Sequence, residues 1–520
     1  MNRSIRKVAV ALVVLLAALF VNLNFVQVVK GSELRNDQRN KRVLLNEYAS
    51  PRGDINVQGS AVAHSTVTKD ELKYLRVYPQ GRRDAAVTGY YSFIYGTSGI
   101  ESAEDGVLSG NSDKLFSSRV SDVLTGRNPR GGSVELTLDR AAQQAAFDNL
   151  VKDNNGKARA GAVVAIDPAT GAILAAVSSP SFDPSTLSSH NSQEIQRAWA
   201  ALNPRSRSSP LINRAFQQRY PPGSTFKVIV AAAALKAGIT RGTHLIAPNG
   251  YYPETGRTGP CSGTNSACVQ NFGGEKCDNG KTATLQFSLA KSCNTTFAAL
   301  AVEKLGGQQI ANEATLFGFD SPTPLQVPLD VAGSTVGTTA DLTRNGFLAR
   351  TAFGQQDVAM TPLQGAMVAS AVANDGILMQ PYLVDKEVAP NLSVLHKTAP
   401  TQLSQVLDPN LAREMQTMMG AVVTEPEGTG HPAAITDISG VAVGGKTGTA
   451  DTGRTLANGK AEPPHAWFIG YAMHNGVPKI AVAVIIENGG VQGNETTGGE
   501  AAAPVAKAVM EAYLKAHPGG

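Results

Sequence analysis

The chain has 520 residues, which is enough for two or three domains. It carries 46 basic and 42 acidic side chains, so its formal net charge is only +4 and 17% of its residues are charged. This balance provides no strong positive field, and we therefore expect no nucleic-acid partner. The hydrophobic content of 42% is ample for a folded core.

The amino terminus predicts a membrane anchor. Arg3, Arg6 and Lys7 precede a charge-free apolar stretch over residues 8–29, and Lys30 follows it. This length is about what a helix needs to cross a bilayer. By the positive-inside rule, the basic residues before the stretch stay in the cytoplasm and everything after Lys30 is exported. A cleaved signal peptide is the alternative, but no convincing Ala-x-Ala site is present, so we favour an uncleaved anchor in the cell membrane.

Residues 30–156 predict a small, irregular membrane-proximal domain without a catalytic role. Residues 31–43 are polar and charged, which predicts a stalk off the membrane. Further along, residues 134–139 predict a strand, and Asp139 predicts the cap of a helix that runs through Leu150.

A second domain is expected over residues 157–520. Residues 161–167 and 171–177 are apolar runs joined by an Asp-Pro turn with a following glycine, which predicts a hairpin. Residues 182–213 predict a long polar loop. Further strands are expected near the end of the chain, over 441–449, 466–472 and 480–486, before a closing helix from about 500 to 514. Strands at both ends with alanine-rich helices between them predict one antiparallel sheet covered by helices, an α/β (α+β) fold.

The four cysteines, Cys261, Cys268, Cys277 and Cys293, lie within one short segment. In an exported chain this pattern favours disulfides. The spacings are not Cys-x-x-Cys and no histidine cluster accompanies them, so no metal site is expected. Three pairings are possible, and we favour Cys261 with Cys268 and Cys277 with Cys293.

Ser224 and Lys227 stand at the start of a helix that is apolar on every side. The Pro-Pro-Gly before Ser224 interrupts any preceding helix, and the apolar run that follows predicts a buried one. A lysine in such a place is costly unless it is neutral or paired, and a desolvated lysine beside a serine can activate it as a nucleophile. A capped structural helix is the alternative, because Ser-x-x-Lys is common by chance and occurs twice more in this chain.

Two further motifs complete a candidate site. In Ser292-Cys-Asn294 the hydroxyl could relay a proton and the amide could hold a substrate carbonyl, although a helix cap is the common role of such a triplet. Lys446-Thr447-Gly448-Thr449 predicts a strand on which a peptide could be added, with the missing side chain of Gly448 making room for it. An edge strand protected by its lysine is the alternative.

The order Ser-x-x-Lys, Ser-x-Asn, Lys-Thr-Gly resembles the penicillin-recognising serine acyl-transferases. Several other segments resemble the same transpeptidases, namely residues 161–171, 179–184, 213–215, 353–355, 360–362 and 465–470, and residues 50–55 and 99–101 resemble the non-catalytic domain of class B members. The resemblance covers about residues 50 to 515. The short amino-terminal domain is most similar to the actinobacterial penicillin-binding protein A type.

This resemblance implies a peptidoglycan D,D-transpeptidase that needs no cofactor, cross-links stem peptides and is acylated by β-lactams. Ser224 would be the nucleophile and Lys227 its base, with Ser292 and Lys446 passing a proton to the leaving amine. Backbone N–H groups of Ser224 and Thr449 would form the oxyanion hole. The resemblance also implies that the hydroxyls of Thr447 and Thr449 bind a substrate carboxylate and that Asn294 binds the peptide.

A D,D-carboxypeptidase would use the same residues and transfer the acyl group to water. A membrane β-lactam sensor is the alternative from another class, but the seven residues before the anchor leave little to carry a signal. A β-lactamase would need a second activated water, and no segment clearly supplies the added glutamate for it. Residues 30–156 are too few for a typical glycan polymerase, so the resemblance implies a separate membrane glycan polymerase as partner.

Overall fold

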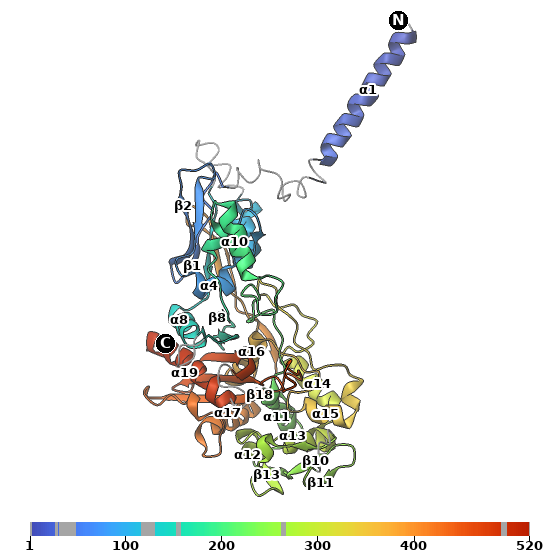
Figure 1. The fold of residues 1–520 in the computed structure, drawn as a ribbon, viewed down its shortest axis with the longest axis vertical. Coiled ribbons are helices and arrows are strands. Elements are labelled where there is room, and N and C mark those ends of the chain that lie inside the picture. Colours follow the sequence, from blue (N-terminus) through green and yellow to red (C-terminus); the bar gives the residue numbers. More distant parts are fainter. Residues whose placement is uncertain are drawn as a thin grey trace.

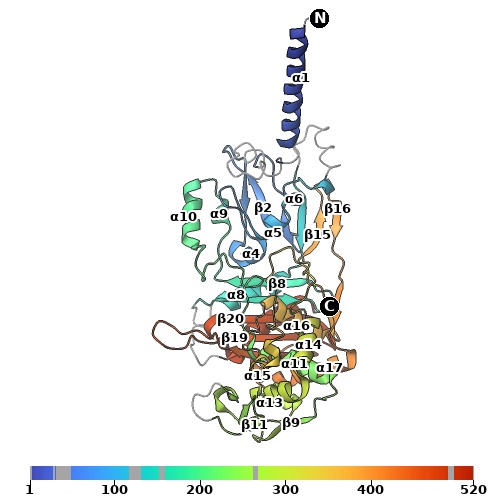
Figure 2. The same cartoon turned by 90° about the vertical axis from the view of Figure 1, so that its right-hand side faces the viewer.

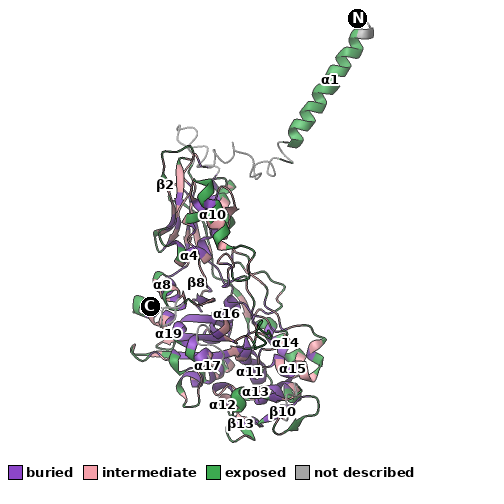
Figure 3. Ribbon diagram, in the orientation of Figure 1, coloured by how far each residue is buried: buried purple, intermediate pink, exposed green. Residues whose placement is uncertain are grey.

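The computed structural model describes residues 3–26, 30, 48–115, 130–151, 158–261, 267–489 and 497–518. Helix α1 (Arg3–Asn24) contains a span of 20 residues, Ile5–Asn24, with a mean hydropathy of 2.2. The span is exposed along its length, in contrast to the buried helices of the main body (Figure 3). It is long and apolar enough to cross a membrane. The predicted stalk, residues 31–43, lies outside the described residues.

A five-stranded antiparallel sheet forms the centre of the larger part of the molecule, which we call the central sheet. Its strands pair in the order β18-β19-β20-β7-β8. Both ends of the region contribute to it, as the sequence predicted, and the predicted hairpin at residues 161–177 is confirmed. The strands are β7 (Gly161–Ile166), β8 (Ile173–Ser179), β18 (Val441–Ala450), β19 (His465–His474) and β20 (Val477–Ile486).

Helices cover both faces of the central sheet. Helix α16 (Pro362–Ala373) packs against β7, β19 and β20, and α8 (Arg140–Val151) and α19 (Ala503–Ala516) pack on the opposite face. Asp139 caps α8 through its contact with the Ala142 N–H, as predicted. The closing helix differs from its prediction because α18 (Gly498–Ala501) is separate from α19.

The helices that carry the candidate site lie beyond α16, toward the end of the molecule far from α1 (Figures 1 and 2). The central one is α11 (Lys227–Lys236), whose residues from Lys227 to Leu235 are all buried. Helices α12 (Leu285–Ala290), α14 (Gly307–Leu316) and α17 (Pro409–Thr424) pack against it, and α13 (Asn294–Leu300) and α15 (Asn345–Thr351) lie in the same region.

The part nearer α1 is built on a second sheet of six strands, in the order β16-β15-β6-β1-β2-β3. Four strands come from the predicted membrane-proximal region: β1 (Ile55–Val57), β2 (Ser60–Val67), β3 (Tyr74–Val77) and β6 (Ser133–Leu136). The other two, β15 (Val384–Val388) and β16 (Val394–Lys397), come from the middle of the second region; β15 pairs with β6, and β16 pairs with β15. The sequence did not predict this exchange, which ties the two parts together (Figure 2).

The prediction of a polar loop over residues 182–213 is wrong in one respect, because this segment contains α9 (Ser185–Ser188) and α10 (Ser192–Leu202). Asn191 caps α10 by accepting from the Gln193 and Glu194 N–H groups. Ile195, Trp199 and Leu202 pack in a small cluster with Tyr90, so the helix is held by one apolar stripe on an otherwise polar segment.

A buried ionic cluster holds the amino-terminal sheet to its helices. The Glu101 carboxylate is fully buried and accepts from the side chains of Arg52 and Arg76, each at 2.6 Å, and from the Tyr78 hydroxyl at 3.1 Å. Burial alone would raise the pKa of Glu101, but the two guanidinium groups outweigh it and hold this pKa below its usual value.

We predict that Glu101→Gln lowers the free energy of unfolding by about 3 kcal/mol, because it removes the carboxylate that pairs with the buried Arg76 guanidinium and leaves Arg52 paired with Asp105 alone. Since the pKa of Glu101 is depressed, the ionised carboxylate stabilises the fold above its unfolded pKa, and this contribution is lost as pH falls through the folded value. Chemical unfolding at pH 7 and at pH 4 measures both effects. Glu71→Gln, at an exposed position, is the control; equal stability of the two variants would contradict the prediction.

Candidate active site

Ser224 lies on a tight turn that leads directly into α11. This 3-10 turn, Gly223–Phe226, follows Pro222. It is fixed from two sides, since the Gly223 N–H donates to the Gly354 carbonyl at 2.9 Å and the Trp467 indole N–H donates to the Pro221 carbonyl at 3.0 Å. Gly354 has φ +74°, and a Cβ there would lie 2.0 Å from the Gly223 carbonyl oxygen. The backbone contact that positions Ser224 therefore requires glycine at position 354.

Lys227 and Ser224 face each other across the first turn of the helix, as predicted. The Nζ atom of Lys227 lies 3.0 Å from Ser224 Oγ. It also lies 2.6 Å from the Ser292 carbonyl oxygen, 3.2 Å from Ser292 Oγ and 2.7 Å from Asn294 Oδ1. The side chain is fully buried. The structure therefore brings the first two predicted motifs together around one amine.

The partners of Lys227 can satisfy a neutral amine that acts as a base. The Ser292 carbonyl and Asn294 Oδ1 can only accept hydrogen bonds, so they take its two N–H groups. The orientation of the Asn294 amide follows from its other end, where Nδ2 donates to the Gln270 carbonyl at 3.2 Å. The nitrogen lone pair is then left to accept the hydroxyl proton of Ser224.

The electrostatic surroundings of Lys227 also favour its neutral form. Burial, and then repulsion from Lys446, lower the pKa of Lys227 well below its ordinary value. Burial lowers the pKa of Lys446 to about 7. The Lys446 amine donates to Ser292 Oγ at 2.9 Å and to the Thr447 carbonyl at 3.0 Å. The Ser292 hydroxyl thus lies between two amines that both lose their charge readily.

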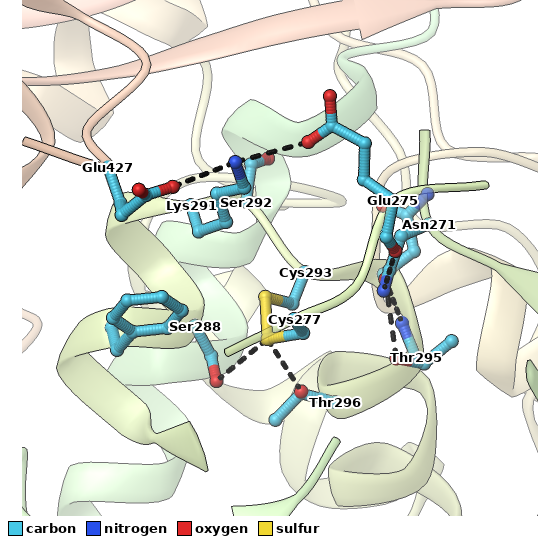
Figure 4. The surroundings of a disulfide bond; sticks show 12 residues. Asn271, Glu275, Cys277, Ser288, Lys291, Ser292, Cys293, Thr295, Thr296 and Glu427 are labelled. Carbon is cyan, nitrogen blue, oxygen red and sulfur yellow. Dashed lines mark hydrogen bonds and ion pairs between the residues drawn. A yellow bond between two sulfur atoms is a disulfide. The ribbon is translucent and has the colours of Figure 1, made fainter. Parts of the chain in front are cut away.

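A disulfide holds the Ser292–Asn294 segment in place (Figure 4). Cys293 is bonded to Cys277, and both are buried. Ser292 has φ +66°, which a residue with a side chain rarely adopts without support from its surroundings. Asn271 adds a second tie, because its Oδ1 accepts from the Thr295 N–H at 3.1 Å. The chain is therefore held at two points just after Ser292, at Cys293 and at Thr295.

The second disulfide joins Cys261 and Cys268, so both pairings are the ones that the sequence favoured. Among the residues that the structure describes, no group of three or more His, Cys, Asp or Glu side chains is placed to hold a metal ion.

Strand β18 brings the third motif to the site, but Gly448 has a different part in it from the one expected. A Cβ at position 448 would lie 2.9 Å from the Pro222 carbonyl oxygen and 3.0 Å from Thr225 Cγ2. The missing side chain makes room for the turn that carries Ser224, and the expected space for a substrate is not there. The reason is strand alternation, since Gly448 shares the inward face with Lys446 while Thr447 and Thr449 line the pocket.

A cavity of about 430 Å³ opens over Ser224. The predicted residues Ser224, Ser292, Asn294, Thr447 and Thr449 line it. Lys227 and Lys446 lie buried beneath it, in contact with Ser292. The sequence reasoning did not place another group of lining residues there, which includes Asn271, Phe272, Glu275, Lys291, Glu427, Thr429 and Asp451. Phe353 and Gln355 also line the cavity, and their Phe-Gly-Gln motif was the one available signal.

Ion pairs connect the rim of this cavity. The Lys291 ammonium lies 3.1 Å from a Glu275 carboxylate oxygen and 2.9 Å from one of Glu427 (Figure 4). All three side chains are partly exposed, so each pair contributes little to stability. Their arrangement places both positive and negative charge at the rim of the cavity.

Comparison with known proteins agrees with this geometry. Residues 161–511 match the model of the penicillin-binding protein transpeptidase domain. Residues 52–134 match the penicillin-binding protein A dimerisation domain. The first match covers more than half of the chain, and the chain therefore belongs to the penicillin-binding protein transpeptidase family.

Individual relatives are similar along nearly their whole length. The chain is 43% identical to the peptidoglycan D,D-transpeptidase PbpA of Mycolicibacterium smegmatis over 518 residues, which cover 99% of each. It is 42% identical to the PbpA of Mycobacterium tuberculosis, over 100% of each chain. The ceftriaxone acyl-enzyme complex of penicillin-binding protein A from M. tuberculosis is 40% identical with a TM-score of 0.81, and the match covers 91% of this chain and 100% of that one.

We predict that Gly354→Ala costs roughly 3 kcal/mol of unfolding free energy, because it combines backbone strain with a clash against the Ser224 turn. Gly453→Ala is the matched control, since Gly453 also has a positive φ of +68° but no atom within 4 Å of its Cβ position. The control should cost about 1 kcal/mol. Chemical unfolding of both variants measures the difference, and equal losses would show that the Gly223 contact is not constrained.

Proposed function

We propose that this protein is a peptidoglycan D,D-transpeptidase in which Ser224 is the acylated nucleophile. The observation that carries the proposal is the set of contacts of Lys227: its Nζ lies 3.0 Å from Ser224 Oγ, and two acceptor-only partners take both N–H groups of the neutral amine, so that its lone pair can accept the Ser224 proton. Two relatives are named D,D-transpeptidases, which supports this reaction. One relative was solved as an acyl-enzyme complex, which supports a covalent acyl-enzyme intermediate.

Acylation follows from these contacts. Ser224 Oγ attacks the carbonyl carbon of the penultimate D-Ala of a stem peptide, and its proton passes to Lys227. The tetrahedral oxyanion is bound by the backbone N–H groups of Ser224 and Thr449; loss of one such donor typically costs about 3 kcal/mol in the barrier. The C–N bond then breaks, and Ser292, between the amines of Lys227 and Lys446, delivers a proton to the departing D-Ala amine.

Substrate binding uses the wall formed by β18 and α13. The hydroxyls of Thr447 and Thr449 bind the terminal carboxylate of the donor, beside the cation of Lys446 while it is charged. The Asn294 amide carries a second N–H besides the one given to Gln270, and this group binds the peptide carbonyl. Gly448 contributes indirectly, by letting the nucleophile turn pack against the strand.

The acyl-enzyme is then attacked by the amine of a neighbouring stem peptide. A new peptide bond forms, the ester to Ser224 breaks, and the serine recovers its proton. A β-lactam acylates the same oxygen, but its ring opens without losing a leaving group, so the ester persists.

We also propose the membrane arrangement and the partner. Residues 1–7 lie in the cytoplasm, the anchor of residues 8–29 crosses the membrane once, and the rest is extracytoplasmic, divided into residues 30–156 and a catalytic domain of residues 157–520. The apolar helix α1 supports the anchor. Because the catalytic domain forms only the peptide cross-link, a separate membrane glycan polymerase must supply the strands.

The test uses the full-length chain in detergent, with fluorescent penicillin and with a D-Ala-D-Ala donor. We expect covalent labelling in the wild type and none in Ser224→Ala, because only this oxygen is acylated. Ser185→Ala, on α9 and outside the cavity, is the control and should label normally. Labelling that survives Ser224→Ala would overturn the proposal. With an amine acceptor present, release of D-Ala should give a cross-linked product; release to water alone would show a carboxypeptidase instead.

A further inference from the structure

Thr429 is a pocket residue that none of the three motifs includes. It belongs to the connection between α17 and β18, in the segment Glu425-Pro-Glu-Gly-Thr-Gly430. Its side chain lines the cavity over Ser224 together with Thr447. The hydroxyl oxygens of the two threonines are 2.5 Å apart, at the short end of the range for a hydrogen bond between hydroxyls.

The backbone of Thr429 is held from two directions. Its N–H donates to the Ala290 carbonyl at the end of α12, at 3.3 Å. Its carbonyl oxygen lies 2.3 Å from where a Cβ of Gly499 would be, so α18 approaches it as closely as a glycine allows. Thr429 therefore joins α12, α18 and β18 at one point. A residue fixed in this way can orient a neighbouring hydroxyl.

The direction of the hydrogen bond between the two hydroxyls decides what Thr447 can offer to a ligand. Each hydroxyl has one proton. If Thr429 donates to Thr447, the Thr447 proton remains for a group in the pocket. If Thr447 donated to Thr429, it would present only lone pairs to the pocket, which would repel an anion. The alternative acceptor for the Thr429 proton, the Ala290 carbonyl, is 3.5 Å away and already accepts the Thr429 N–H.

We infer that Thr429 is a positioning residue for carboxylate recognition: it donates to Thr447 and so directs the Thr447 proton toward the carboxylate of the acyl donor. This inference rests on the proposed function, in which Thr447 binds that carboxylate. Thr429 does not touch the reacting atoms. Thr429 therefore affects the acylation rate only for acyl donors that carry the carboxylate bound by Thr447.

The test compares two acyl donors on the full-length chain, benzylpenicillin and its methyl ester, which lacks the carboxylate. Thr429→Val keeps the shape and removes the hydroxyl. We expect it to slow acylation by benzylpenicillin about tenfold, the size of one hydrogen bond, and to change acylation by the ester less than twofold. Thr429→Ser keeps the hydroxyl and should acylate at nearly the wild-type rate with both donors.

Thr417→Val is the matched control, because Thr417 is exposed on α17 and its hydroxyl donates only within that helix. It should acylate normally. In the background of Thr447→Val, the Thr429→Val change should have no further effect, since the two hydroxyls act as one unit. Should Thr429→Val not fold, Thr429→Ala serves for the same comparison.

Equal slowing with both donors would overturn the inference and assign Thr429 a purely structural role. So would an unchanged rate with benzylpenicillin, or a Thr429→Ser variant as slow as Thr429→Val. Failure of the proposed function would give a different result, because labelling by fluorescent penicillin would then survive Ser224→Ala. That result would also overturn the inference about Thr429.

Discussion

The structure depends on one constraint, which is that Lys227 must be buried without its charge. An ammonium group in this position would cost several kcal/mol. The fold avoids that cost by favouring the neutral amine: Lys446, close to Ser292, repels a charge on Lys227, and two carbonyl-type acceptors satisfy the N–H groups of the neutral form. The helix itself is held in the core by the burial of Val228, Ile229, Val230 and Leu235, each worth about 2 kcal/mol. Lys227 is therefore placed as a neutral base beside Ser224, on a helix whose residues from Lys227 to Leu235 are buried.

This constraint explains why three distant segments must converge. The acceptors of Lys227 come from residues 65 and 67 positions further along the chain, and Lys446 contacts Ser292 across a separation of 154 residues. Such contacts are long-range and carry a large entropic cost. Three features hold these segments together: a disulfide at Cys293, and close backbone contacts at Gly354 and at Gly448. The chemistry therefore rests on close backbone packing as much as on the functional side chains.

Much of the site could be predicted from the sequence because its signals are local. Ser224 and Lys227 are one helical turn apart, and the apolar run after them indicates burial. The antiparallel sheet followed from strong apolar runs and turn residues.

By contrast, strands β15 and β16 join the amino-terminal sheet through pairing across more than 240 residues, which no local pattern encodes. The partner of Thr447 could not be predicted either, because Thr429 stands in an ordinary turn and acquires its role only through tertiary packing. The role of Gly448 was misjudged for a related reason, since strand alternation gives two faces but not which of them meets the nucleophile turn.

The most direct measurement of the central claim is the pH dependence of acylation by benzylpenicillin in the wild type and in Lys446→Gln. Acylation needs neutral Lys227, so the rate should rise with pH and level off far below pH 10, because the pKa of Lys227 is lowered by burial and by Lys446. Removing the Lys446 charge removes the repulsion, which raises the pKa of Lys227 and moves the rising limb to higher pH. Lys276→Gln, at the exposed rim of the same pocket, should leave the limb in place. A wild-type limb near the ordinary lysine pKa, or a limb that does not move in Lys446→Gln, would contradict the account.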